Sequence, residues 1–430
     1  MFLKRVFCAG VCVCLVLPAW AAKASAPGSA PLSISVHATQ NIDPSLQMFI
    51  KKVWQDSPTI LGAQATLAAA QARVEAADKP LHNPSLELDT ERTNINTTTI
   101  GLSQTLDWSD KQEALVDVAN RELQAIQASL RQARQGIAVE ALEAIARYTT
   151  THEMRSLALR RSELMKEFID AVKQKHAAGD VAALDVTLAQ VAYSEALMAQ
   201  AASDSELAEA EAALQAVSGL AMSQWPALPN ELASPPELAD PALLESLPNL
   251  VVLKSRMETA RARIHVAKRE GQIDPTLGLR AGREDTETLV GLTLAIPLFV
   301  RNNYKAQVRA ASHEAVAEEL AYRDAHRRAK ARLDGSLSRF QNTSRAWQTW
   351  AANGQQAQRE QMSLLEQMWQ AGELTATDYL IQAKQNIDTQ AAATALMGDV
   401  WQAAIAWLEA SGQVEPWLGL APAQAKNSGE

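Results

Sequence analysis

Two matching stretches, AGDVAALD at residues 178–185 and AGELTATD at residues 371–378, decide how this chain folds. Each has a glycine after a small residue, an acid directly after the glycine, and an aspartate five residues beyond that acid. Glycine ends helices because it adopts the left-handed backbone conformation at little cost, and an aspartate supports the start of the next helix. Both stretches therefore predict a turn between two helices.

The two turns belong to a duplication that covers most of the chain. The matching pairs, in chain order, are NPSLEL at 83–88 with DPTLGL at 274–279, GLSQTLDW at 101–108 with GLTLAIPL at 291–298, the two turns, and AVSG ending at 219 with EASG ending at 412. Their offsets are 191, 190, 193 and 193 residues. Four ordered matches at nearly constant offset predict two homologous halves.

Long helices fill most of each half. No proline occurs between Pro84 and Pro226 or between Pro297 and Pro416, and Gly136 is the only glycine from residue 109 to residue 177. Apolar residues in that stretch recur at steps of four and three, which is typical of a helix packed against neighbours: Ala119, Leu123, Ile126, Leu130, Ala133 and Ile137. A helix of about 69 residues is on the order of 100 Å long, which excludes a compact domain.

Composition and the N-terminus narrow the class of protein. The 430 residues are only 5% aromatic, and the net charge of −9 argues against a nucleic-acid partner. Lys4 and Arg5 precede an apolar run and an A-x-A-like site, which predicts a secretory signal peptide over residues 1–21, or as far as residue 26. All three cysteines lie within it, so the mature chain is expected to have no disulfide and no thiol chemistry: Cys8, Cys12 and Cys14.

Period-two alternation predicts a β-hairpin before each long helix, at residues 84–107 and 275–298. Alternation alone fits a membrane-crossing hairpin and a soluble ribbon packed on helices equally well. Four strands leave two open edges, and open edges cannot face lipid, so a membrane location requires closure by other copies of the chain. Three copies give a barrel of about 12 strands, continued by a tube of helices.

These patterns predict the following organisation of the chain. A signal peptide (1–21) is followed by an N-terminal segment with a first helix (22–82), the first repeat (83–219), a proline-rich linker (220–248), the second repeat (249–412) and a C-terminal tail (413–430). The first repeat contains a hairpin (84–107), a long helix (109–177), a turn (178–182) and a return helix (183–219). The second contains a hairpin (275–298), a long helix (301–370), a turn (371–375) and a return helix (376–410).

In this organisation the chain resembles the outer membrane factor (TolC-like) family of tripartite efflux systems. The motifs NPSLEL, GLSQTLDW and LTLAIPLFVRNNYKAQVRAA at residues 292–311 are similar to the heavy-metal, cobalt–zinc–cadmium branch. One motif departs from that branch, because SDKQ at residues 109–112 stands where a Gly-Gly-Lys-Arg-like run is usual. The resemblance implies a mainly α chain with duplicated halves, which trimerises into a 12-stranded β-barrel on an α-helical periplasmic tunnel in the outer membrane of a Gram-negative bacterium.

The resemblance also implies a function without catalysis. It points to a passive trimeric exit duct that works with a periplasmic adaptor and an inner-membrane RND pump and exports divalent heavy-metal cations. Organic compounds or drugs and type I secreted polypeptides stay open as alternative substrates, and a non-conducting periplasmic coiled-coil scaffold is an alternative of another class. The sequence contains no nucleotide-binding loop, nucleophile elbow or zinc-helix motif, and its seven histidines are scattered, so no enzyme, cofactor or resident metal is expected.

The turns are the candidate functional residues. In the family, the end of the tunnel far from the strands meets the adaptor and forms the closed entrance, which makes the two turns the expected adaptor contacts: Ala178, Gly179, Asp180, Ala371, Gly372 and Glu373. Three copies would place up to twelve carboxylates at one constriction, where they would favour cations: Asp180, Asp185, Glu373 and Asp378. A turn without that role carries acids too. Trp108, at the end of the first hairpin, is expected to anchor in lipid headgroups.

Overall fold

The computed structural model describes residues 43–420 except residues 95, 222–224 and 230–231, and these residues belong to one unit, residues 41–430. The predicted signal peptide lies outside the described residues.

Both halves repeat one order of elements. The first half has α1 (Pro44–Asp56), α2 (Pro58–Ala77), β1 (Ser85–Arg92), β2 (Asn96–Thr105), α3 (Lys111–Ala178) and α4 (Ala183–Ser218). The second has α5 (Leu243–Ser246), α6 (Pro248–Glu270), β3 (Thr276–Glu284), β4 (Glu287–Ala295), α7 (Lys305–Thr349), the π-helix η1 (Trp350–Gly354), α8 (Gln355–Gln370), α9 (Ala376–Ser411) and α10 (Val414–Trp417).

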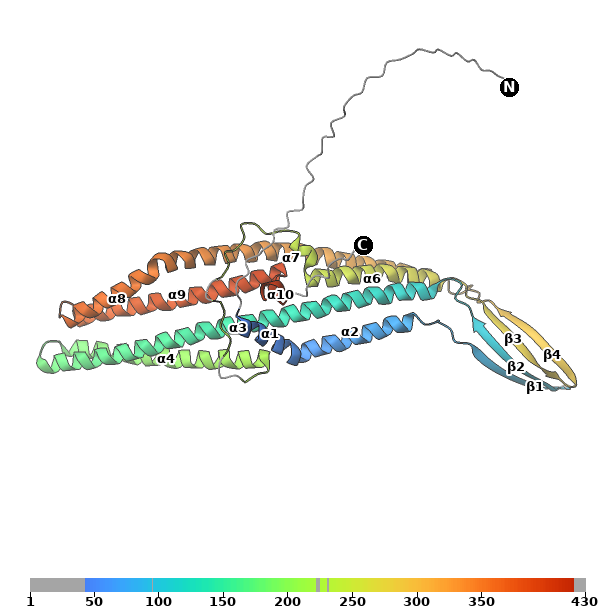
Figure 1. The fold of residues 1–430 in the computed structure, drawn as a ribbon, viewed down its shortest axis with the longest axis horizontal. Helices are drawn as coiled ribbons and strands as arrows, with labels where there is room; N and C mark the ends of the chain where they lie inside the picture. Colours follow the sequence, from blue (N-terminus) through green and yellow to red (C-terminus); the bar gives the residue numbers. More distant parts are fainter. Residues whose placement is uncertain (1–42, 95, 222–224, 230–231, 421–430) are drawn as a thin grey trace, which may run out of the picture. The chain divides into compact units, whose positions relative to one another are not determined.

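The long helices separate the strands from the helix turns. Within this unit the four strands lie at one end, and the α3–α4 and α8–α9 turns lie at the other (Figure 1). The short helices α1 and α10 lie partway along the bundle (Figure 1). The predicted fold class, a mainly helical chain with two hairpins and long helices, is confirmed.

Several elements differ from those expected. The helix before the first hairpin is two helices, because Ser57 is extended and Pro58 begins α2. Proline at the first helical position loses no hydrogen bond and so starts a new helix readily. The linker and the tail contain the short helices α5 and α10, and the hydrogen-bonded strands are shorter than the predicted hairpins.

The second long helix also differs from the expected 301–370, because it starts at Lys305 and is interrupted by the π-helix η1. The Trp350 ring lies over Gly354, where an added Cβ would be 2.2 Å from the ring. Gly335, the other glycine of this rod, lies inside α7 without disturbing it.

The strands form one antiparallel sheet in the order β1-β2-β3-β4. The central pair joins the two halves of the chain, with Leu102 opposite Leu279 and Ile100 opposite Ala281. The outer strands, β1 and β4, each pair on one side only and are therefore the open edges.

Several separate apolar clusters, and no single core, hold the helices together. The largest joins α1, α3, α4, α9 and α10 around Leu46, Leu142 and Ile405, which are fully buried. Along its first half α3 packs on α2 and α6, and farther on it packs on α4 and α9. The side of α3 that is buried therefore changes along the length of the helix. Two of the predicted seam residues, Ala119 and Leu130, are buried, and the other four are half-buried.

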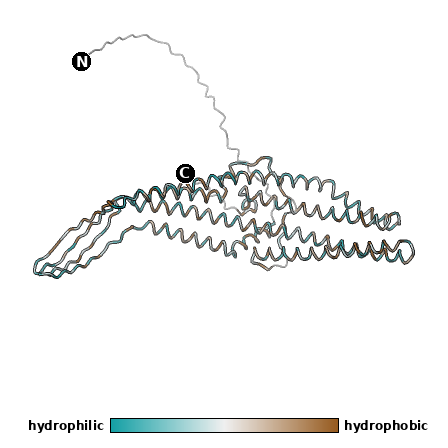
Figure 2. Tube along the Cα trace, turned by 180° about the vertical axis from the view of Figure 1, so that it is seen from behind, coloured by the Kyte–Doolittle hydropathy of each residue, from teal (hydrophilic) through white to brown (hydrophobic). Residues whose placement is uncertain are grey.

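Hydropathy is mixed along every helix. Figure 2 shows hydrophilic and hydrophobic residues interspersed over the helical trace. None of the helices in the described part of the chain carries an apolar stretch of membrane-crossing length.

Candidate functional sites at the helix turns, the sheet and their junction

The glycines of both helix turns have the left-handed conformation expected of them. Gly179 has φ +90° and Gly372 has φ +76°. In the first turn the Gly179 N–H donates to the His176 carbonyl (3.0 Å), and the next N–H donates to the Lys175 carbonyl (2.9 Å). The second turn repeats both bonds, from Gly372 to Trp369 and from the next residue to Met368. These are Schellman motifs, which satisfy the last carbonyls of a helix.

The two aspartates that follow the turns cap the return helices. The Asp185 carboxylate accepts from the Ala182 N–H (3.0 Å) at the start of α4. The Asp378 N–H donates to the Thr375 hydroxyl (3.1 Å), and that hydroxyl donates to the Asp378 carboxylate (2.6 Å). Asp185 therefore caps α4 directly, whereas Asp378 supports Thr375, the N-cap residue of α9.

The structure brings the two turns together across 192 residues of sequence. The Thr377 hydroxyl lies 3.4 Å from the Asp185 carboxylate. Nearby, the rings of Phe168, Trp369 and Tyr379 pack with centroids 5.2–5.5 Å apart. Burial, with the charges of Glu366 and Glu167, raises the pKa of Tyr379 to about 12, so the phenol is neutral at physiological pH. The turns of the two halves thus share one apolar cluster.

The acids of the predicted entrance ring fall into two groups. Asp185 and Asp378 have capping roles, and Asp180 and Glu373 are exposed, with their backbone N–H groups closing the Schellman motifs. The His176 ring contacts the Val181 carbonyl across the first turn (2.8 Å). In the part of the chain that the structure describes, no three His, Cys, Asp or Glu side chains are placed to hold a metal ion together.

The sheet has one apolar and one polar face. Two rows of paired residues cross the apolar face: Leu86, Leu102, Leu279 and Leu292, then Leu88, Ile100, Ala281 and Val290. These leucines, the isoleucine and the valine are 55–85% exposed. On the other face the described strand residues include one cation, Arg280, and five carboxylates. The carboxylates are those of Glu87, Asp89, Glu91, Glu284 and Glu287.

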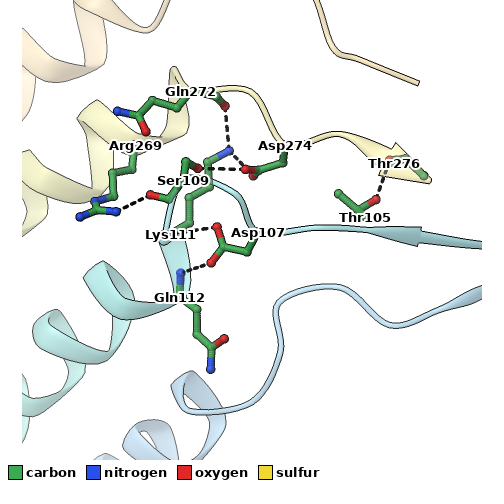
Figure 3. Close-up of polar contacts among 9 residues, drawn as sticks. All are labelled: Thr105, Asp107, Ser109, Lys111, Gln112, Arg269, Gln272, Asp274 and Thr276. Carbon is green, nitrogen blue, oxygen red and sulfur yellow. Dashed lines mark hydrogen bonds and ion pairs between the residues drawn. The ribbon is translucent and has the colours of Figure 1, made fainter. Parts of the chain in front are cut away.

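A polar cluster connects the sheet to the helices (Figure 3). Asp107 caps α3, accepting from the Lys111 and Gln112 N–H groups at 2.8 Å each. The Lys111 ammonium pairs with Asp274 of the second half at 2.6 Å, and the Ser109 hydroxyl donates to the same carboxylate at 2.9 Å. The Arg269 guanidinium donates to the Ser109 carbonyl. The strand-to-helix exit of one half is thus tied to the helix-to-strand connection of the other.

Asp274 is the buried member of this junction cluster. Its side chain is 6% exposed and that of Lys111 is 19% exposed. Burial alone would raise the pKa of the Asp274 carboxyl, but the hydrogen bonds from Lys111 and Ser109 and the charge of Lys111 outweigh burial and hold that pKa below its usual value. The Asp274 carboxyl is therefore ionised at neutral pH.

Sequence reasoning identified the turns but not their partners. The sequence analysis did not predict that the turns are joined by Thr377, Phe168, Trp369 and Tyr379. It also did not predict the Lys111–Asp274 pair, although both residues lie in motifs that it identified. One feature of the repeat could have indicated this pair, because DPTLGL places Asp274 two residues before β3, the strand that pairs with the first hairpin. Trp108, the predicted headgroup anchor, is 75% exposed.

Known proteins share both the sequence pattern and the fold. Residues 49–220 match the family model described as outer membrane efflux protein. The cobalt-zinc-cadmium resistance protein CzcC of Cupriavidus metallidurans is 24% identical over 258 residues, 56% of this chain and 62% of CzcC, so the match spans less than two thirds of that relative. The nickel-cobalt-cadmium resistance protein NccC of Alcaligenes xylosoxydans is 26% identical over 314 residues, 70% of this chain and 68% of NccC. The outer membrane protein VceC of Vibrio cholerae has a TM-score of 0.72 at 17% identity, covering 85% of this chain and 96% of VceC.

Proposed function

Because the chain belongs to the outer membrane efflux protein family, we propose that three copies of it form a passive exit duct for a tripartite efflux system. Proteins of this family are non-enzymatic transport proteins of the outer membrane, with a helical tunnel in the periplasm. The duct would carry out no chemistry of its own. A periplasmic adaptor and an inner-membrane RND pump would supply substrate and energy.

The four-stranded sheet carries this proposal. Its apolar face is exposed, and its edges β1 and β4 each have one unpaired side. In lipid, every unpaired backbone N–H and C=O costs several kcal/mol, so an open sheet with such a face is stable there only when its edges are paired. Pairing β4 of each copy with β1 of the next closes the strands of three copies into a 12-stranded barrel with its polar face inward.

The polar face supports cations as the substrate. Its five carboxylates and single arginine would line the lumen, and negatively charged walls raise the local concentration of cations. CzcC and NccC are named for resistance to cobalt, zinc, cadmium and nickel. We therefore favour divalent heavy-metal cations over organic compounds, drugs or secreted polypeptides.

The helix turns are proposed as the adaptor contacts and the entrance. The Schellman turns at residues 178–180 and 371–373 are exposed and lie at the end of the bundle far from the strands. In a trimer, Asp180 and Glu373, with the capping acids Asp185 and Asp378, would place up to twelve carboxylates around the entrance. That ring would attract cations, and its like charges would repel one another.

Outer membrane preparations test the duct. We expect an SDS-resistant trimer that conducts ions in planar bilayers and prefers cations to anions. A soluble monomer that never conducts would overturn the proposal in favour of the periplasmic scaffold.

A deletion strain tests the substrate. It should become sensitive to at least one of zinc, cobalt, cadmium, copper and nickel, and the wild-type gene should restore tolerance. Unchanged tolerance to all five metals with new sensitivity to dyes or detergents would replace metal cations by organic compounds and leave the duct itself intact.

A further inference from the structure

We infer that residues 296–300, together with Leu106 and Trp108, form a lipid-binding band below the hydrogen-bonded strands that contacts the phospholipids of the periplasmic leaflet. The inference rests on the proposed membrane position of the sheet and adds residues that lie outside it. We call Leu106, Trp108 and residues 296–300 the lower band.

The strands by themselves are too short on their apolar face. On β4 that face runs from Val290 to Leu294, four residue steps, or about 13 Å at about 3.3 Å each. A strand tilt of about 40° leaves roughly 10 Å of height, whereas the apolar band of an outer membrane barrel is about 25 Å tall. More than half of the required height must come from elsewhere in the chain.

The alternation of β4 continues beyond its last ladder residue, Ala295. Ile296, Leu298 and Val300 keep the even-numbered positions of the apolar face, and their side chains are 49%, 75% and 85% exposed. Pro297 and Phe299, at the odd positions, line a hollow of about 670 Å³, and Ile296 contributes to the same lining, so Leu298 and Val300 are the residues directed fully outward. From Val290 to Val300 an extended chain spans about 33 Å, and the same tilt leaves about 25 Å of height. The lower band therefore supplies the missing height.

A second strand continues in the same way. Leu106 keeps the face of Ile100 and Leu102 and is 39% exposed, and Trp108, in the turn that follows, is 75% exposed. The Leu106 N–H still bonds across to the Pro275 carbonyl (3.0 Å), so this strand continues past its last ladder residue. Tryptophan is enriched at the membrane–water interface, where its ring meets both acyl chains and headgroups.

Charge at the end of the lower band favours phospholipid as the occupant. Arg301 follows Val300 directly, and Lys305 begins α7; both are exposed. Cations at this level attract the phosphates of anionic lipid headgroups. A neighbouring copy that extends the sheet would pair with the backbone edge of β4, and this pairing leaves the apolar face uncovered.

Site-directed fluorescence tests the lower band. Val300→Cys and Leu298→Cys would be labelled singly with the fluorophore NBD, since the expected mature chain has no cysteine. SDS-resistant trimers of each variant would be placed in vesicles of phosphatidylethanolamine and phosphatidylglycerol. Quenching would be compared among lipids with a nitroxide on the headgroup, lipids with a nitroxide on the acyl chain, and iodide in water.

We expect lipid nitroxides to quench both labels and iodide to quench them weakly, with the headgroup nitroxide more effective at Val300 than at Leu298. Leu292→Cys, in the middle of the sheet, is the control for deep burial in lipid. Met198→Cys, on α4 and 66% exposed, is the control for a periplasmic position and should respond to iodide alone.

Two results would overturn the inference. Quenching of the Val300 and Leu298 labels by iodide alone would place the lower band in water, and protection from every quencher would mean that another copy of the chain covers it. The Leu292 label separates this failure from failure of the duct. If lipid nitroxides reach Leu292 but neither lower-band label, only the lower band is wrong; if they do not reach Leu292, the membrane position of the sheet is wrong as well.

Discussion

The conformation of the helix turns can be perturbed without disturbing their packing. We consider the variant Gly179→Val/Gly372→Val, which adds a β-branched side chain to both turns. An ideal Cβ at either glycine meets no atom within 4 Å, so the substitution causes no clash. The cost therefore comes from the backbone, because φ values of +90° and +76° are unfavourable for a residue with a Cβ.

The magnitude follows from that conformation. A left-handed residue other than glycine costs roughly 1–2 kcal/mol, so the two substitutions cost about 2–4 kcal/mol per chain. The apolar cluster beneath the turns, centred on Phe168 and Tyr379, keeps its contacts. We expect each turn to open and its two closing hydrogen bonds to weaken, while the rest of the helical bundle stays folded.

The assays separate assembly from transport. Unheated SDS gels of outer membranes should show normal amounts of trimer, and metal tolerance should fall to that of the deletion strain. In hydrogen exchange, peptides covering residues 176–182 and 369–375 should exchange about 5- to 30-fold faster, the factor that corresponds to about 1–2 kcal/mol per turn.

Two controls make the result specific. Gly179→Asn/Gly372→Asn should retain transport, because asparagine tolerates the left-handed conformation better than valine does. Gly136→Val adds the same side chain inside α3, where there is also no atom within 4 Å, and should be silent. Loss of the trimer in the valine variant would show that the turns serve assembly, and normal metal tolerance would refute a role of the turn conformation in transport.

Four further predictions concern contacts that join the halves and the proposed lumen. Lys111→Met leaves the buried Asp274 carboxylate without its cation and should cost roughly 2–4 kcal/mol of stability, measured by thermal melting of the trimer. The double variant Lys111→Met/Asp274→Asn should recover most of this loss. Since the pKa of folded Asp274 is lowered, its contribution to stability should be present above about pH 4 and lost as the pH falls further. The melting temperature of the wild-type trimer should therefore fall below about pH 4 relative to that of Asp274→Asn. An unchanged difference between the two melting temperatures would contradict this prediction. Trp369→Ala removes a partly buried ring from the apolar cluster that joins the two turns and should lower local stability by about 2–3 kcal/mol. Hydrogen exchange should then be faster in both turns. Faster exchange in α8 alone would mean that the turns are not coupled. Glu284→Gln/Glu287→Gln removes six of fifteen carboxylates from the proposed lumen of a trimer and should lower the cation-to-anion permeability ratio in planar bilayers; an unchanged ratio would show that these acids do not face the ions.

Local rules in the sequence determined much of the architecture. The duplication, the two long rods, the two glycine turns and the alternating strands depend on interactions between residues close in the chain: glycine at positive φ, a capping acid, and apolar spacing of 3.6 or 2. Boundaries differ from the expected ones at Pro58, which begins a new helix, and at the π-helix, in which Trp350 packs over Gly354. A single sequence does not reveal which ring lies on which glycine.

Contacts between distant residues were decided only by the tertiary structure. The β2–β3 pairing joins the halves into one sheet, Lys111 meets Asp274 across 163 residues, and Asp185 meets Thr377 across 192. No local periodicity encodes such pairs, because each depends on how two separately folded hairpins and rods are placed in space. The sequence by itself therefore determined the repeated elements and the turns. The structure decided how the halves are joined and showed that the apolar face continues below the strands, because exposure depends on every element packed around a residue.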